Sequence, residues 1–320
     1  VGNNAALGTD TLTMAGGTTL RAMAGDLTLA NNVTLSGIGT VDTQAYTLTL
    51  DGFIGGASGA LVKTGAGTLN LMSANGFGGG VDLTAGTLGV GNNAALGTGA
   101  LAMENTTTLR AMAGDLTLAN NVTLSGIGTV DTQAYTLTLD GFIGGASGAL
   151  VKTGAGTLNL MSANGFGGGV DLTAGTLGVG NNAALGTGAL AMENTTTLRA
   201  MADSLTLANT IDVDGTGTVD TQAYTLTLDG VLGDGSGTLN KTGTGKLILS
   251  GGADSLAGLD VQGGTLENRG SLTAAASMLM SGAGTSLLNQ AGASIAVNGG
   301  AGTILGAAGT QSVDNLGAIS

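Results

Sequence analysis

Apolar and polar residues alternate with a period of two along most of the chain. Segments such as TLTM, LTLA, YTLTLDG, TLNLM and VDLTAGTL place Leu, Val or Met at every second position, between Thr, Asn or Asp. Such alternation predicts short β-strands that turn one face toward a core. We expect Leu69 and Leu71 to point inward and Thr68 and Asn70 to point outward. The expected strand centres are Leu12, Leu20, Leu27, Val41, Leu48, Leu69 and Leu83.

Clusters of Gly and Asn, such as GIG, GGASG and ANN, separate these strands. Both residue types adopt the positive φ angles of tight turns at little cost. No segment carries a convincing helical stripe, because Gly-Thr-Gly interrupts the nearest candidate, AALGTGALAME. We therefore predict parallel strands throughout and less than about a tenth of the residues in helices, against about a third in globular proteins.

The sequence repeats itself with a period of 89 residues. Val1-Gly2-Asn3-Asn4 returns at Val90 and Val179 (90 − 1 and 179 − 90). This period predicts three units, 1–89, 90–178 and 179–267, followed by a diverged continuation of the same fold over 268–320. The third repeat has diverged from the first two. Val231 replaces the Phe found at positions 53 and 142, and Ser255 replaces the Phe found at positions 77 and 166. Duplication of this kind is easiest when each unit contacts only its neighbours.

Short strands with tight turns are compatible with a sandwich, a propeller or a solenoid. Frequent turns, the absence of long loops and a division of each unit into about four turns of ~22 residues favour the solenoid. We predict an all-β, right-handed, single-stranded parallel β-helix of about 14 turns. Equivalent residues of successive turns are expected to stack, with Leu inside and Asn at the corners.

Composition narrows the functional classes. With 42% hydrophobic residues, the chain has enough apolar surface to bury, which argues against disorder. A net charge of −13 and only eight Lys and Arg residues exclude the basic footprint of a nucleic-acid-binding protein. The chain has no Cys and no apolar run of the ~18 residues that a membrane helix needs. It begins at Val1 without an initiator Met or a signal peptide, so we expect a piece of a longer protein.

Two sets of recurring carboxylates are the candidates for catalysis. Paired carboxylates could serve glycoside hydrolysis. We instead interpret them as outward polar residues or turn caps, aligned along the fold by duplication, because no group of distinct residues is confined to one place. His and Cys are absent, which removes the usual base and thiol nucleophile. We therefore predict no catalytic residue and no enzyme activity. The two sets are Asp42, Asp131 and Asp220 in VDTQAY, and Asp51, Asp140 and Asp229 in LDG.

No pattern predicts a metal or cofactor site. The Gly-Gly-x-Gly-x-Asp nonapeptide of calcium-binding rolls is absent, and GGADSLAGLD is the nearest approach. Thr-x-Thr pairs are typical of ice-binding solenoids, but Ala, Asn and Asp interrupt them here. Three tyrosines are expected to cover a corner of the core rather than form a ligand platform: Tyr46, Tyr135 and Tyr224. Three lysines are expected to be solvated turn residues: Lys63, Lys152 and Lys241.

A longer ordered pattern recurs around these lysines. It comprises Lys63, Gly65, Gly67, Thr68, Leu69, Leu71, Asn75, Phe77, Gly79, Gly80, Ala85, Gly86, Thr87 and Leu88. It starts again at Lys152, and a third, weaker copy at Lys241 lacks the Asn and the aromatic residue. The pattern resembles the autotransporter-associated β-strand repeat, also called the passenger-associated transport repeat. The resemblance implies a passenger domain on the bacterial cell surface, outer-membrane associated, with a translocator β-barrel in the full-length protein outside this chain.

We therefore expect a structural or adhesive extracellular stalk without a cofactor. Its ligand is not specified by the sequence, and a host cell, a polysaccharide or a second copy of the chain all remain open. One alternative is an end-to-end stacking subunit of an extracellular fibre, because open β-helix ends invite pairing. Another is a polysaccharide-acting β-helix enzyme, which would need carboxylates converging in one groove.

Overall fold

The computed structural model describes residues 1–233, 236–298, 304–306 and 311–320. All regular secondary structure in these residues is β-strand, and the strands pair in parallel to form a β-solenoid of about 14 turns. The predicted all-β fold, with parallel strands and almost no helix, is confirmed. Within the described residues, no helix is long and apolar enough to cross a membrane.

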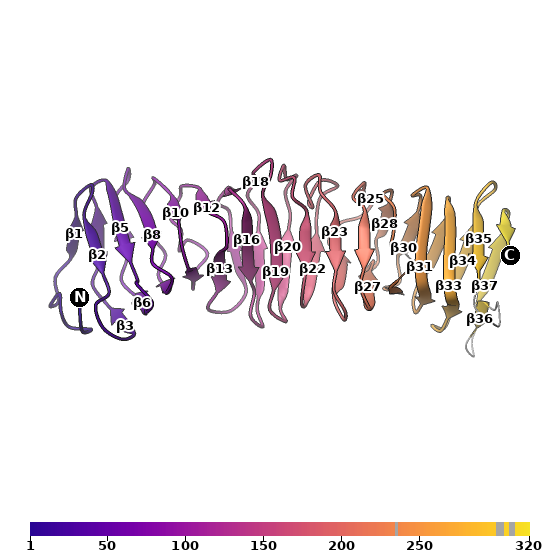
Figure 1. Cartoon of the computed structure of the whole chain (residues 1–320), viewed down its shortest axis with the longest axis horizontal. Coiled ribbons are helices and arrows are strands. Elements are labelled where there is room, and N and C mark those ends of the chain that lie inside the picture. Colours follow the sequence, from indigo (N-terminus) through magenta and orange to yellow (C-terminus); the bar gives the residue numbers. More distant parts are fainter. Residues whose placement is uncertain (234–235, 299–303, 307–310) are drawn as a thin grey trace. The chain divides into compact units, whose positions relative to one another are not determined.

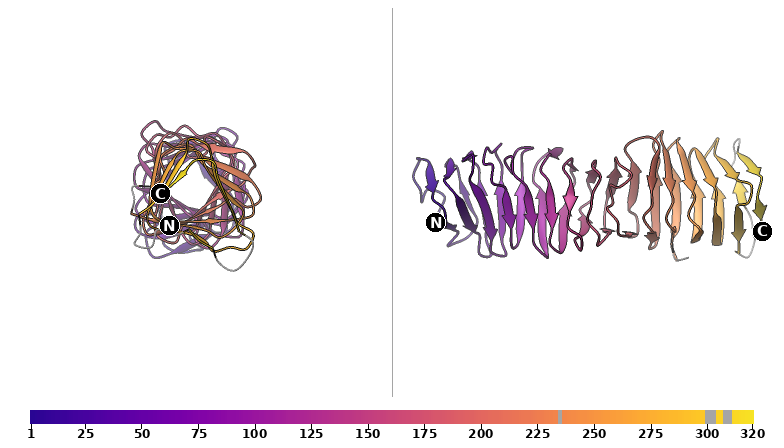
Figure 2. Two further views of the ribbon diagram at one scale, coloured as in Figure 1. Left: turned by 90° about the vertical axis from the view of Figure 1, so that its right-hand side faces the viewer. Right: turned by 90° about the horizontal axis from the view of Figure 1, so that it is seen from above.

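The chain divides into two compact units, Val1–Gly168 (unit 1) and Gly169–Ser320 (unit 2). In each unit, strands of successive turns lie side by side (Figure 1) and wind around a central core (Figure 2). The boundary between the units does not coincide with a boundary of the 89-residue repeat. The division into three repeats and a continuation therefore stays a sequence-based prediction.

Unit 1 contains the first twenty strands, most of which are three to five residues long. They are β1 (Leu12–Met14), β2 (Thr19–Arg21), β3 (Leu27–Leu29), β4 (Val33–Leu35), β5 (Ile38–Asp42), β6 (Thr47–Leu50), β7 (Ile54–Gly55), β8 (Ala60–Thr64), β9 (Thr68–Leu71), β10 (Val81–Leu83), β11 (Thr87–Val90), β12 (Leu101–Met103), β13 (Thr107–Ala111), β14 (Leu116–Leu118), β15 (Val122–Leu124), β16 (Ile127–Asp131), β17 (Thr136–Leu139), β18 (Ile143–Gly144), β19 (Ala149–Thr153) and β20 (Thr157–Leu160).

Unit 2 contains the remaining strands of the described residues, two of which are markedly longer. They are β21 (Val170–Leu172), β22 (Thr176–Val179), β23 (Leu190–Met192), β24 (Thr197–Ala200), β25 (Leu205–Leu207), β26 (Ile211–Val213), β27 (Thr216–Asp220), β28 (Thr225–Leu228), β29 (Thr238–Thr242), β30 (Lys246–Leu249), β31 (Ala253–Val261), β32 (Thr265–Asn268), β33 (Ser271–Met280), β34 (Ser286–Asn289), β35 (Ser294–Val297), β36 (Ile304–Gly306), β37 (Ser312–Asn315) and β38 (Ala318–Ile319).

The strands of unit 1 form the three faces of a solenoid. One face is the sheet β2-β5-β8-β10-β12-β15-β18, and a second contains β3-β6-β9-β11-β13-β16-β19. The third face begins as β1-β4-β7 and ends as β14-β17-β20. Between these two parts of the third face lie two loops, residues 73–80 and 91–100. The first loop bonds to β7, because the Gly76 amide donates to the Ile54 carbonyl, and the second bonds to β14, because the Thr117 amide donates to the Asn93 side chain.

Unit 2 is built on the same plan. Its described strands form the series β21-β23-β26, β22-β24-β27-β29-β31-β33-β35-β38 and β25-β28-β30-β32-β34-β37, with β36 paired to β33. Asparagines stack along the last series, where the buried Asn268 donates to the buried Asn289, and Asn289 donates to the exposed Asn315, both at 2.9 Å. This stack is one of the Asn columns that the turn-by-turn register predicts.

The 89-residue repeat does not contain a whole number of turns. Strand register connects Gly39 through Leu61, Val81 and Leu101 to Val122, which is four turns. The counterpart of Gly39 in the next repeat is Gly128, six residues farther on (128 − 122). Those six residues carry the chain to the next face, so β5 and its copy β16 belong to different sheets of unit 1. The repeat therefore holds about four turns, as expected, but its copies are not aligned on one another, so the expectation that duplication aligns equivalent residues along the fold is wrong.

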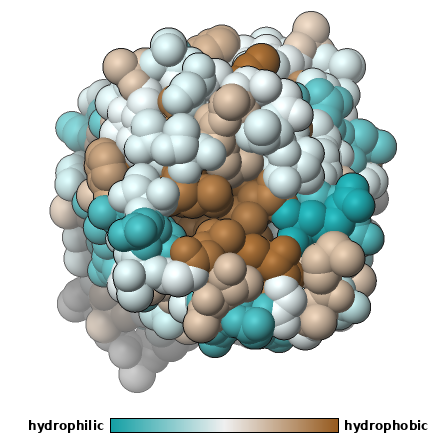
Figure 3. Space-filling view, turned by 90° about the vertical axis from the view of Figure 1, so that its left-hand side faces the viewer, coloured by the Kyte–Doolittle hydropathy of each residue, from teal (hydrophilic) through white to brown (hydrophobic). Residues whose placement is uncertain are grey.

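The core follows the predicted alternation. Leu69 and Leu71 are fully buried, and each stacks on its counterparts in the turns before and after it. Figure 3, which views unit 1 from its N-terminal end, shows this apolar interior ringed by polar residues. Asn70 departs from the expectation of an outward, solvated residue, because it is only 6% exposed. It lies against Gly89, where a Cβ atom would come within 2.3 Å of the Asn70 Oδ1 atom.

Candidate functional site

The three pattern lysines are fully buried, so the expectation that they are solvated turn residues is wrong. Strand β8 turns the side chain of Lys63 inward, and its ammonium group donates to three backbone carbonyls. The acceptors are Thr64 at 3.0 Å, Gly65 at 2.7 Å and Ala85 at 2.9 Å. Lys241 makes the corresponding bonds and one more, to the Thr221 hydroxyl at 2.8 Å.

Burial of these ammonium groups shifts their proton affinity. Desolvation lowers the pKa of Lys63 from 10.5 to about 8, and the negative charge of Asp42 opposes that shift. Lys152 and Lys241 behave in the same way, beside Asp131 and Asp220 respectively. Since the amines are enclosed and bonded to carbonyls of two successive turns, their role is to hold corners of the solenoid together. They are not accessible to a substrate.

The VDTQAY aspartates form turn caps, as one of the two interpretations predicted. The Gln44 amide donates to Asp42 Oδ1 at 2.9 Å, which stabilises a turn in which Gln44 has φ of 52°. Arg21, one turn earlier, donates to Asp42 Oδ2 at 2.9 Å. These contacts, led by the Gln44 backbone hydrogen bond, lower the pKa of Asp42. The same arrangement recurs at Asp131 with Arg110 and at Asp220 with Arg199.

These carboxylates are neither outward nor aligned. Asp42 is 8% exposed and Asp131 is 9% exposed, so the expectation of an outward polar residue is wrong for both. They end strands β5 and β16, which lie on different faces of unit 1. The LDG aspartates, Asp51 and Asp140, are exposed at corners. In the described part of the chain, no three acidic side chains gather closely enough to hold a metal ion.

The aromatic residues fall into two classes. Phe77 and Phe166 are fully buried inside their loops, whereas Phe53 and Phe142 are about half exposed. Phe53 lies over two glycines, where a Cβ on Gly55 or Gly76 would approach its ring within 3.0 Å. Of the tyrosines expected to cover a corner of the core, Tyr46 is half-buried, and Tyr135 and Tyr224 are about one third exposed (37% and 36%).

A buried asparagine fixes each aromatic loop. Asn75 accepts the Ile54 amide at 2.8 Å and donates to the Ala95 carbonyl at 2.7 Å, so one side chain bridges three successive turns. Asn164 accepts the Ile143 amide in the second copy. Both asparagines and both aromatics belong to the repeated pattern, so the sequence indicated these positions although it did not show what they bind.

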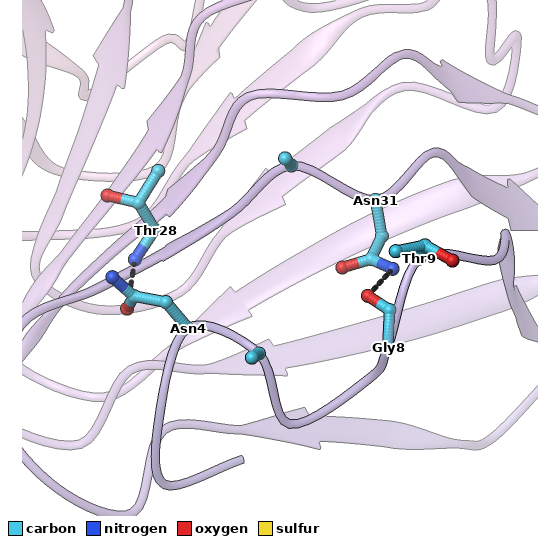
Figure 4. Close-up of a pocket in the computed structure, with 7 residues that line it drawn as sticks. Asn4, Gly8, Thr9, Thr28 and Asn31 are labelled. Atoms are coloured by element: carbon cyan, nitrogen blue, oxygen red, sulfur yellow. Dashed lines mark hydrogen bonds between the residues drawn. The ribbon is translucent and has the colours of Figure 1, made fainter.

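A second recurring asparagine was not singled out from the sequence. Asn31 donates to the carbonyls of Gly8 and Asp10, at 3.1 and 2.8 Å, and thereby clamps a loop of the preceding turn (Figure 4). Beside this clamp lies a pocket of about 390 Å³, whose lining is Asn4, Ala5, Gly8, Thr9, Thr28, Ala30 and Asn31. The LTLAN shared by all three copies, at residues 27–31, 116–120 and 205–209, was the signal in the sequence for this asparagine, and the identical NNAALGT was the signal for the loop that it clamps.

Parts of the chain are similar to a known protein family and to a known protein. Three segments, 61–90, 150–179 and 239–267, match the passenger-associated-transport-repeat family. One curated relative is the "Adhesin BmaC autotransporter" of Brucella suis biovar 1 (strain 1330), which is 42% identical over 127 residues. That match covers 39% of this chain but only 4% of the relative. No solved structure gives a significant match.

The matched segments correspond to one structural element of the solenoid. Each begins at an inward Leu two residues before a buried lysine, and each includes the three strands that follow the lysine strand. In the first, β10 pairs with the lysine strand β8, and β11 pairs with β9. The pattern is thus the sequence of two stacked turns joined at a Lys corner. The chain carries three passenger-associated-transport repeats, which form turns of its β-solenoid.

Proposed function

We propose that this chain is part of the extracellular passenger of an autotransporter, where it serves as an adhesive stalk on the bacterial surface. The observation that carries the proposal is the occurrence of three passenger-associated-transport repeats as turns of one type of parallel solenoid. The 42% identity to a protein named an autotransporter adhesin supports it. A solenoid suits this role because repeated turns add length without changing the local fold.

The test displays the chain on beads at equal density and counts attachment to cultured cells and to matrix-coated surfaces. A matched variant lacks residues 90–178, which removes one full repeat and rejoins identical sequence. If the repeats carry the adhesive surface, attachment per bead falls with the loss of one copy. Beads that bind no better than beads with an unrelated acidic protein would contradict the adhesive role.

Fibre formation and catalysis are separated by two further measurements. Sedimentation of the purified chain at increasing concentration shows whether it remains a monomer, as a stalk requires, or stacks end to end. Polysaccharide cleavage is followed by the release of reducing ends, with an Asp42→Asn, Asp131→Asn, Asp220→Asn variant as control. If the native chain cleaves a polysaccharide and the folded variant does not, the chain is an enzyme and the stalk proposal is wrong.

A further inference from the structure

The pocket beside Asn31 exists in more than one copy of the repeat. In the second copy, Asn93, Ala94, Gly97, Thr98, Ala119 and Asn120 line a pocket of about 290 Å³ at the matching position. We propose that these pockets bind a neutral sugar unit of a glycan. This inference rests on the adhesive role proposed above and names the chemical class of the ligand.

The pocket is held open by two hydrogen-bonded bridges between adjacent turns. At one end, the Thr28 amide donates to Asn4 Oδ1 at 3.0 Å, and at the other, Asn31 clamps the carbonyls of Gly8 and Asp10 (Figure 4). The pocket is lined by Ala5 and Thr9 of the loop and by Thr28 and Ala30 of the following turn. Because both bridges are already formed, a ligand does not have to order the loop.

The second copy shows that the pocket is a regular feature of the repeat. Asn120 donates to the carbonyls of Gly97 and Gly99, and Asn93 accepts the Thr117 amide. The preceding turn is in place there, since the Asn75 amide donates to the Ala94 carbonyl at 2.9 Å. The hollow therefore does not depend on the first turn of the chain. The third copy repeats both bridges, through Asn182 and Asn209.

The lining chemistry suits a neutral, hydroxyl-rich ligand. No charged side chain lines either pocket. The hydroxyls of Thr9 and Thr28 and the Nδ2 group of Asn4 make no hydrogen bond to another described residue and can donate to sugar hydroxyls. The methyl groups of Ala5 and Ala30 offer a small apolar surface to a sugar ring. The chain's net charge of −13 opposes the approach of anionic glycans.

Successive repeats place their pockets on different faces of the solenoid, and this determines how glycans can bind. The first pocket adjoins β3 and the second adjoins β14, which lie on different faces of unit 1. A single glycan chain lying flat on one face cannot enter both pockets. The repeats therefore present their pockets to separate glycan chains, and weak single-site binding is raised by multivalency.

The experiment screens the purified chain against an array of neutral, sialylated and sulfated oligosaccharides, and then titrates the best neutral one. The first variant places a larger side chain at the equivalent alanine of each copy (Ala30→Leu, Ala119→Leu, Ala208→Leu), and the second removes the hydroxyl of the threonine two residues before it (Thr28→Val, Thr117→Val, Thr206→Val). A matched control changes exposed strand threonines elsewhere (Thr34→Val, Thr123→Val). All of these side chains are exposed on strands or their ends, and circular dichroism verifies the fold.

We expect neutral oligosaccharides to bind the native and control chains, and both pocket variants to bind at least tenfold more weakly. Binding that survives in both variants, a preference for anionic glycans, or no neutral binding would overturn the inference. Bead attachment to cells stripped of surface glycans separates the two proposals. Attachment that persists there and in the pocket variants keeps adhesion and rejects the glycan pocket, whereas native beads that never attach reject the adhesive function itself.

Discussion

The loop after the TLNL strand differs between the first two copies of the repeat and the third. In copies one and two, residues 73–80 and 162–169 are irregular, with a buried Asn and a buried Phe at fixed places. In copy three the same part of the turn belongs to the nine-residue strand β31, and the residues that replace the Asn and the Phe stand one position later in the repeat. Asp254 accepts the Leu232 amide where Asn75 accepts that of Ile54, and the fully buried Leu256 lies where the Phe does.

This comparison separates what the solenoid requires from what it tolerates. The position needs an oxygen that accepts the amide of the preceding turn and an apolar side chain that fills the corner. An irregular loop is not required, and neither is an amide group. Asp254 meets the first requirement with one carboxylate oxygen, but its Oδ2 atom is buried without a hydrogen-bond partner. The third copy therefore keeps the fold at a cost that the first two avoid.

The largest effect on stability is expected at a core position that is the same in copies two and three. Leu158 in copy two and Leu247 in copy three are fully buried. Leu158→Asp and Leu247→Asp each bury a carboxylate without a partner, and each should lower the local free energy of unfolding by about 5 kcal/mol. Native-state hydrogen exchange measures both losses turn by turn. A cost at Leu247 far below that at Leu158 would show that copy three differs beyond its loop.

The corner that the buried lysine holds together is also common to all copies, and its loss should have the next largest effect on stability. Lys63→Met removes an ammonium donor from three part-buried carbonyls, of which that of Thr64 still accepts the Thr43 amide, and should cost about 3 kcal/mol. Lys241→Met should cost at least as much, because its ammonium group also bonds to Thr221. Urea unfolding at pH 7 measures both.

The pH dependence of the native chain gives an independent check of the Lys corners. Each folded pKa is lowered to about 8 from 10.5, so the unfolded chain holds more protons between these values. The free energy of unfolding should therefore rise from pH 8 to pH 10.5. A flat profile over that range would contradict the burial of these amines. In a variant that replaces all three lysines by Met, this rise should disappear.

Asp254 should make the third copy more stable in mild acid than at neutral pH. Burial raises the pKa of Asp254 from 3.8 to about 6, with the Leu232 amide acting in the opposite direction. The folded state thus holds the proton more tightly, and stability that is present below pH 3.8 is lost as the pH rises through 6. The loss amounts to about 3 kcal/mol. Asp254→Asn should remove this dependence in unit 2 and stabilise its turns at pH 7.

The matched change is Asn164→Asp, which places the same carboxyl in copy two. It should create, at that turn, the pH dependence that Asp254→Asn removes. Hydrogen exchange at pH 4.5 and pH 7 compares the two variants turn by turn. If the native chain shows equal protection at both pH values around β31, Asp254 is not a buried acid.

The sequence predicted those parts of the structure that depend on near neighbours in the chain. Alternation placed Leu69 and Leu71 in a strand core, and Gly-rich turns marked the corners. Lys63 could not be placed in the same way, because its acceptors include Ala85, 22 residues away. Asn31 likewise binds carbonyls 21 and 23 residues earlier. The advance by one face per repeat arises because each repeat is six residues longer than four turns, and only the strand register shows this excess.

The smallest expected effect concerns the aromatic side chain of the loop. Phe166 is fully buried, and copy three fills the matching corner with Leu256. Phe166→Leu should therefore cost only about 1 kcal/mol, because one apolar side chain replaces another and part of the volume remains filled. Phe142→Leu is the matched control, since that ring is 48% exposed and mainly covers two glycines, and it should cost about half as much. Urea unfolding ranks the two variants. A loss above 3 kcal/mol at Phe166 would show that the irregular loop depends on the aromatic ring, and that copy three could use Leu only because it had first become a strand.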